Sequence, residues 1–227
     1  RTQAAACAFL AGATIDSSHR NHMLESRLIS CLATSMSEHP SNPHIQDYVC
    51  FVLTNLILDT EDWESFTRGA DIFNLLVNVV SGTHWIDESL RQGICRAINL
   101  FVIHSHPSQF SSSIWHVLEF GTKILERHAT EDRSIVSHCL AFIANIGDLY
   151  TSGEISLATE SLSFLGHVVA AMKANQPDEA IQEIACAILF HFTPTEDPNV
   201  LEQLVESEMD AIGSVLLAVK KFPQNKG

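Results

Sequence analysis

The chain has 227 residues, of which 46% are hydrophobic and 18% are charged, and its formal net charge is −14. This fraction of hydrophobic residues is too high for an intrinsically disordered tail. The longest apolar stretches, such as residues 72–80, are much shorter than the roughly 20 residues of a membrane-spanning helix, so no transmembrane segment is predicted. An acidic chain whose first Lys is Lys123 suits neither nucleic acid nor anionic membranes, because phosphate groups attract positive charge. Its charge favours basic proteins or peptides as partners.

Apolar periodicity predicts helices along the whole chain. In chain order they are the helix around Cys7, 27–37, the helix around Cys50, 59–68, 72–80, the helix around Cys95, 114–127, the helix around Cys139, 162–173, the helix around Cys186, 198–208 and 211–221. The periodicity is clearest around Cys186, where apolar residues at 181, 184, 185, 188, 189 and 192 form one stripe. Four start signals accompany the helices: Pro43 and Pro177 as first helical residues, and Asp87 and Thr130 as N-caps.

Five of the six cysteines recur at a nearly constant spacing. The intervals between Cys7, Cys50, Cys95, Cys139 and Cys186 are 43, 45, 44 and 47 residues, and each cysteine lies in a similar apolar segment. A period of this length is typical of helical repeats. Because cysteine is small and often fully buried, we expect reduced core thiols at a tight helix contact rather than disulfide bridges. Reduced thiols favour a cytoplasmic or nuclear location.

The period divides the chain into units of three helices: a short first helix, a second helix, and a third helix that carries the cysteine. Met36 precedes Cys50 by 14 residues, and Met172 precedes Cys186 by the same distance. The approximate units within this single domain are 1–24 (partial), 25–68, 69–113, 114–160, 161–208 and 209–227 (partial). The start lacks an initiator Met and a signal-peptide pattern, and neither end has a polar capping unit. We therefore expect the repeats to continue on both sides.

Four segments resemble the armadillo repeat superfamily. Residues 68–76 resemble the glycine-containing bend between the first and second helices of that repeat, while 50–56 and 95–100 resemble its third helix, as does the shorter segment 144–146. The resemblance implies an all-α fold, a right-handed superhelical solenoid of three-helix repeats, and it covers essentially the whole chain. HEAT repeats, which have two helices each, are the close alternative.

In armadillo proteins the third helices line a concave groove, where Asn side chains hydrogen-bond the backbone of an extended peptide. The resemblance places Asn55, Asn99 and Asn145 in this role, 5, 4 and 6 residues after their cysteines. His191 and Gly12 occupy the corresponding positions of two other helices and interrupt the series. The alternative is that these amides bond neighbouring backbone near a helix end.

Nuclear-signal receptors of this family also carry Trp one turn before the Asn. Here those positions hold Phe51, Cys95, Ala141 and Ala187, which disfavours that activity. Acidic clusters at 59–64 and 202–210 could receive a basic partner, although such clusters are more often solvated helix faces.

No pattern in the sequence indicates an enzyme, a metal site or a cofactor. Phosphate-binding and nucleophile-elbow motifs are absent from the sequence. His104 and His106 are two residues apart and do not share a helix face, and no third zinc ligand stands at the required spacing. His138 and Cys139 are adjacent, so they point about 100° apart on a helix and do not form an obvious nucleophile and base.

These observations favour a scaffold that binds an extended segment of a partner protein along the third-helix face. One alternative is a structural or regulatory spacer in a larger protein, acting in cis or by self-association through its open ends. A third, weaker alternative is a sensor holding a small ligand between repeats, for which no residue argues.

Overall fold

The computed structural model describes residues 2–16, 19, 23, 28–58, 88–109, 114–157, 163–193 and 210–223. Within these ranges the predicted all-α fold is confirmed: the chain forms nine α-helices and one short 3-10 helix, and no strand. The chain divides into two compact units, Arg1–His116 and Val117–Gly227, and the boundary falls near the start of α8.

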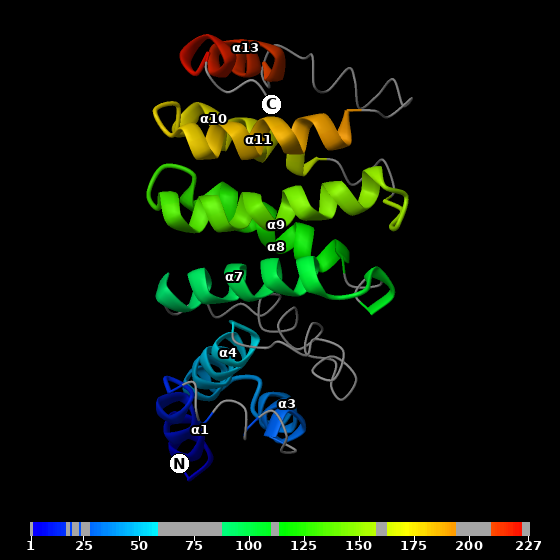
Figure 1. Cartoon of the computed structure of the whole chain (residues 1–227). Coiled ribbons are helices and arrows are strands. Elements are labelled where there is room, and N and C mark those ends of the chain that lie inside the picture. The colour runs from blue at the N-terminus through cyan, green and yellow to red at the C-terminus, as the bar shows by residue number, and fades with distance from the viewer. Residues whose placement is uncertain are drawn as a thin grey trace. The chain divides into compact units, whose positions relative to one another are not determined.

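The first unit is built around α4. It contains α1 (Thr2–Ala13), α3 (Leu28–Glu38), α4 (Pro43–Leu58), α7 (Glu88–His104) and the 3-10 helix η1 (Pro107–Gln109). Helix α4 packs against α1, α3 and α7, and Figure 1 shows it between α1 and α7. Its inner face carries Val49, Val52, Leu53 and Leu56, none of which is exposed. Burial of this face is the main stabilising contribution of the helix.

The second unit is built around the contact of α9 with α11. It contains α8 (Ile114–His128), α9 (Arg133–Thr151), α10 (Phe164–Ala174), α11 (Glu179–Phe192) and α13 (Ala211–Lys221). Helix α11 packs against α9, α10 and α13 (Figure 1). Gly147 permits the close approach of α9 to α11, since a Cβ at this position would lie 2.9 Å from both His191 Cβ and Phe192 Cε2. The ring of Phe192 also stacks on Tyr150 and meets Phe164 edge-on.

The repeating cysteines lie in the five helices α1, α4, α7, α9 and α11, here called the cysteine-bearing helices. Four of them, Cys7, Cys50, Cys95 and Cys139, are buried free thiols as predicted, whereas Cys186 is half-buried. Burial raises the pKa of Cys50 well above its usual range, and the nearby Asp47 carboxylate adds to the effect. Such a thiol stays protonated and unreactive in the folded protein.

The second helices were predicted closely, since 27–37, 114–127, 162–173 and 211–221 correspond to α3, α8, α10 and α13.

Two of the start signals were wrong. Asp132, not Thr130, is the N-cap of α9, because its carboxylate accepts hydrogen bonds from Ser134 N and Ile135 N.

Asp178 likewise caps α11 by accepting from Ile181 N, which places Pro177 outside the helix. Pro43 does begin α4 as predicted. Asp87 and the predicted helices 59–68, 72–80 and 198–208 lie outside the described residues.

Two helix pairs, α3–α4 and α10–α11, are joined in the same way. Gln46 Nε2 donates to Met36 O and His39 O at 3.1 and 3.0 Å, and Gln182 Nε2 donates to Met172 O and Asn175 O at 2.9 and 3.1 Å. The acceptors are carbonyl groups in the last turn of a helix or just after it. Such carbonyl groups have no amide donor within that helix. A glutamine at the start of one helix therefore caps the end of the helix before it, and this contact accounts for the common 14-residue spacing from Met to Cys.

Among the helices in the described ranges, none combines the length and the apolarity needed to cross a bilayer.

Candidate functional site

The three predicted binding residues lie on cysteine-bearing helices. Asn55 is on α4 and Asn99 on α7, two helices of the first unit that pack against each other, while Asn145 is on α9 of the second unit. All three side chains are half-buried. The structure therefore places Asn55 and Asn99 on neighbouring helices, and Asn145 belongs to a separate set with the residues of α9 and α11.

Asn55 takes part in a contact between two cysteine-bearing helices. Its Nδ2 donates to Thr14 Oγ1 at 3.1 Å, and the buried Thr14 hydroxyl donates in turn to Ala11 O at 2.9 Å. The bond ties α4 to the end of α1. Asn99 and Asn145 also have interactions within the protein. An intramolecular role for the amide is thus observed at Asn55, and its contact with a partner stays a prediction.

Helix α4 carries a stripe of accessible residues on the face that bears Asn55. His44, Tyr48 and Phe51 lie 11, 7 and 4 residues before Asn55, a spacing that puts all four on one side of the helix. Tyr48 is 36% exposed and Phe51 44%, although Val49 and Leu53 on the other side of α4 are completely buried. We call Tyr48, Phe51 and Asn55 the α4 stripe. It combines aromatic area with an amide, a composition suited to holding a peptide.

The other two predicted residues lack exposed aromatic neighbours on their own helices. Asn99 lies between Arg96 and Ile103 on one face of α7, and both of these neighbours are exposed. On α9, Asn145 is followed one turn later by the exposed Asp148. Large exposed aromatic rings therefore accompany the Asn of α4 but not those of α7 and α9.

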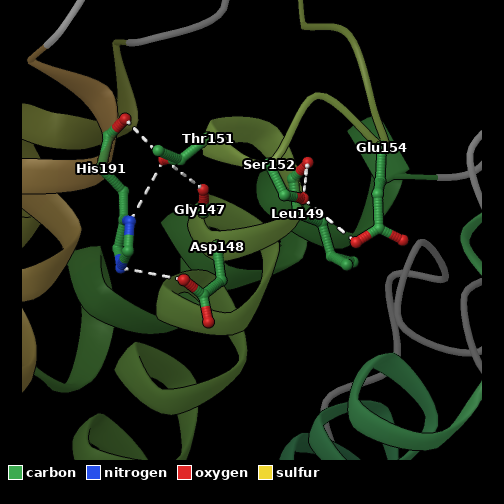
Figure 2. A network of polar contacts seen from close by, with 7 residues as sticks. All are labelled: Gly147, Asp148, Leu149, Thr151, Ser152, Glu154 and His191. Atoms are coloured by element: carbon green, nitrogen blue, oxygen red, sulfur yellow. Dashed lines mark hydrogen bonds and ion pairs between the residues drawn. The ribbon is translucent and has the colours of Figure 1, made fainter.

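In the second unit His191 occupies the position of Asn55 and also links two helices (Figure 2). Thr151 Oγ1 lies 3.2 Å from His191 Nδ1 and donates to Gly147 O at 2.9 Å, while Asp148 Oδ1 lies 3.7 Å from His191 Nε2. A protonated imidazole would pair with this carboxylate. In both units, then, the residue five positions after the cysteine reaches a threonine at the end of the preceding cysteine-bearing helix.

Sequence reasoning missed two contributors to this arrangement. Tyr48 could have been found from its spacing, since it lies one turn before the Phe51 position. Thr151 gave no local signal, because its partner His191 is 40 residues away in the chain. Of the acidic clusters, 59–64 lies outside the described residues, and within 202–210 only Asp210 is described, as the N-cap of α13.

Potential catalytic and metal-binding groups face other partners. His138 Nδ1 lies 2.7 Å from Ser134 O, whereas Cys139 Sγ donates to Gly121 O at 3.4 Å, so the two neighbours do not approach each other as a nucleophile and a base would. His106 Nδ1 lies 2.9 Å from Ser108 Oγ. In the part of the chain that the structure describes, no three His, Cys, Asp or Glu side chains are grouped to hold a metal ion.

No protein-family model matches this sequence, and no curated protein matches it either. Function is therefore inferred from the residues and their geometry.

Proposed function

We propose that this protein is an interaction scaffold, an armadillo-type array of three-helix repeats that holds an extended segment of a partner protein along its cysteine-bearing helices. The cysteine period of 43–47 residues supports the repeat. Three contacts also support it: α4 packs against both α1 and α7, α9 packs on α11, and two helix pairs share the same glutamine hydrogen bonds. Extended binding surfaces are characteristic of such arrays.

The α4 stripe is the observation that carries the proposal. Tyr48 and Phe51 leave more than a third of their surface in solvent, whereas Val49 and Leu53 on the other side of α4 are completely buried. Exposed aromatic side chains next to a polar group are typical anchors at protein interfaces. Asn55 would contribute donor and acceptor groups for the partner's main chain, with Asn99 on α7 and Asn145 in the second unit in the same role.

The net charge of −14 indicates the kind of partner. A basic segment would be attracted to an acidic protein over several ångströms, which raises its association rate. This attraction is screened by salt, so binding should weaken as ionic strength rises.

An affinity capture from the native source tests the proposal. Wild type is compared with the triple variant Asn55→Ala, Asn99→Ala, Asn145→Ala and with the double variant Tyr48→Ala, Phe51→Ala. Gln176→Ala serves as an amide control, since Gln176 is exposed in the turn before α11. The binding segment of a captured protein is then synthesised as a peptide, and its Kd is measured by titration calorimetry.

Thr14→Ala separates binding from stability. It breaks the same hydrogen bond as Asn55→Ala but leaves the amide in place. We expect the peptide to bind wild type, Gln176→Ala and folded Thr14→Ala alike. Its affinity for the triple variant and for the double variant should each fall at least tenfold, equivalent to about 1.4 kcal/mol. Equal affinity for all five proteins would contradict the proposed site.

A further inference from the structure

The end of α11 carries an exposed aromatic ring beside the imidazole of His191. Phe190 is 70% exposed, and the centroids of the Phe190 and His191 rings lie 5.7 Å apart with an interplanar angle of 68°. On the neighbouring helix α9, the Asp148 side chain is 75% exposed, and its Oδ1 lies 3.7 Å from His191 Nε2 (Figure 2). An open aromatic ring and an open carboxylate therefore border one imidazole. We call Asp148, Phe190 and His191 the α11 cluster.

The hydrogen bonds of Thr151 assign the proton of the neutral His191 ring. Thr151 Oγ1 lies 2.9 Å from Gly147 O, compared with 3.2 Å from His191 Nδ1 and 3.3 Å from His191 O. A hydroxyl has one hydrogen, and in a helix threonine commonly donates it to the carbonyl one turn earlier. With that hydrogen on Gly147 O, Oγ1 accepts from Nδ1–H. Nε2 of the neutral ring then carries no hydrogen and faces the Asp148 carboxylate without donating to it.

The Asp148 carboxylate is open to a cation from outside the protein. Its contact with His191 Nε2 is the one ion pair that it makes in the part of the chain that the structure describes. Glu183 is exposed and lies two turns before Phe190 on the same face of α11, so it adds a second negative charge.

Other titratable groups lie on the helices packed against α11, but in the described ranges none of them forms an ion pair or a hydrogen bond with His191. They are Arg133, His138, Cys139 and Tyr150 of α9, His167 and Lys173 of α10, and Asp210, Lys220 and Lys221 at the two ends of α13. The charge that faces the imidazole is therefore that of Asp148.

An arginine side chain matches the α11 cluster. Its aliphatic stem can cover the Phe190 ring, and its guanidinium can donate two parallel hydrogen bonds to the Asp148 carboxylate. The formal charge of −14 attracts such a residue. Asn145 lies one turn before Asp148 on α9, so the cluster continues the surface to which the proposed function assigns the partner's main chain.

We propose that the α11 cluster binds an arginine side chain of the partner segment and releases it when His191 gains a proton. The protonated ring has an N–H group on both nitrogens, so Nε2 competes with the guanidinium for Asp148, and its positive charge repels the arginine. Histidine side chains gain this proton as pH falls from about 7.5 to about 5.5, so the affinity should fall over the same range. The inference rests on the proposed function, because it names one residue of the partner segment and the regulation of its binding.

Fluorescence anisotropy of a labelled hexa-arginine peptide with the full chain tests the proposal at constant salt. At about pH 7.5, Asp148→Asn and Phe190→Ala should each weaken binding about fivefold or more. Both positions are exposed, so both variants should fold, which circular dichroism can verify. Glu154→Gln is the matched control, because the Glu154 carboxylate accepts from Ser152 Oγ at 3.1 Å, away from the cluster (Figure 2). Its removal should change the affinity by less than about twofold.

The pH dependence distinguishes the α11 cluster from general charge attraction. Wild type should bind hexa-arginine about fivefold more weakly at about pH 5.5 than at about pH 7.5. His106→Gln, at an exposed histidine outside the cluster, should keep this ratio, whereas His191→Gln should bind nearly equally at the two pH values. A His191→Gln ratio equal to that of wild type would overturn the proposal.

Two further results would also overturn it: a wild type that does not bind hexa-arginine, or an Asp148→Asn protein that binds it as wild type does. Failure of the proposed function is measured separately, by the captured peptide and the α4 stripe variants. Because the α4 stripe belongs to the other compact unit, the two failures are distinguishable.

Discussion

Replacing Gln182 by Met removes the amide that joins the start of α11 to the end of α10, while keeping a side chain of similar length. Gln182 is 5% exposed and donates to Met172 O at 2.9 Å and to Asn175 O at 3.1 Å. Both acceptors belong to the last turn and cap of α10, where carbonyl groups have no following helical amide. Methionine cannot donate to either one.

The loss in the free energy of unfolding depends on which hydrogen bonds each carbonyl group keeps in the variant. Asn175 O still accepts from Asp178 N at 2.9 Å, so it loses one of two bonds, at a cost of about 1 kcal/mol. Met172 O loses the side-chain donor that reaches it, and an unsatisfied buried carbonyl costs about 1–3 kcal/mol. We therefore expect Gln182→Met to lower the free energy of unfolding by about 2–4 kcal/mol.

Urea unfolding followed by circular dichroism measures this loss. Hydrogen exchange of the α11 amides locates it, because amide protection reports the stability of each region separately. Gln176→Met is the matched control, since Gln176 is exposed and its replacement should change stability by less than about 0.5 kcal/mol. Gln46→Met should cost less than Gln182→Met, because the half-buried Gln46 side chain is more open to water than the buried Gln182 side chain. A Gln182→Met protein as stable as the control would refute the capping role.

Three further predictions use the same unfolding measurements. Gly147→Ala should lower the free energy of unfolding by about 1–3 kcal/mol, because the added Cβ overpacks the contact of α9 with α11. Gly12→Ala should raise it by roughly 0.4–1 kcal/mol, because a Cβ at Gly12 meets nothing within 4 Å. A less stable Gly12→Ala, or an unchanged Gly147→Ala, would contradict this packing. Asp132→Ala should cost about 0.5–2 kcal/mol by removing the N-cap of α9, and Thr130→Ala should be neutral; equal effects would argue against the assigned cap. Burial raises the pKa of Cys50 in the folded state, so above about pH 9 the thiol stays protonated in the folded protein and ionises in the unfolded chain. The free energy of unfolding should therefore fall as pH rises above about 9, by up to ~1.4 kcal/mol per pH unit. Cys50→Ala should reduce that slope.

The helices could be predicted from sequence because their apolar periodicity is strong, but the starts of α9 and α11 could not. Each start offers two plausible signals within three residues. Thr130 competes with Asp132, and Pro177 competes with Asp178. In both helices the aspartate has extended backbone angles, and its carboxylate accepts from amides of the first turn. Because a proline is tolerated just before a helix as well as in its first turn, the Pro177 signal could not decide the position.

The candidate site was predictable only in part. The spacing from the cysteine located Asn55 and the Phe51 position, and the helical period could have added Tyr48. Neither pattern reveals that Asn55 bonds Thr14, because those residues are 41 positions apart and meet only when α4 packs on α1. Long-range side-chain bonds of this kind depend on helix packing, which the periodicity of one helix does not specify.

Burial at equivalent helix positions shows a further limit of prediction from sequence. Met172 of α10 and Val219 of α13 occupy the same helix position and are both apolar, yet one is 1% exposed and the other 62%. Residue type therefore does not decide which of them faces solvent; the neighbouring helix does.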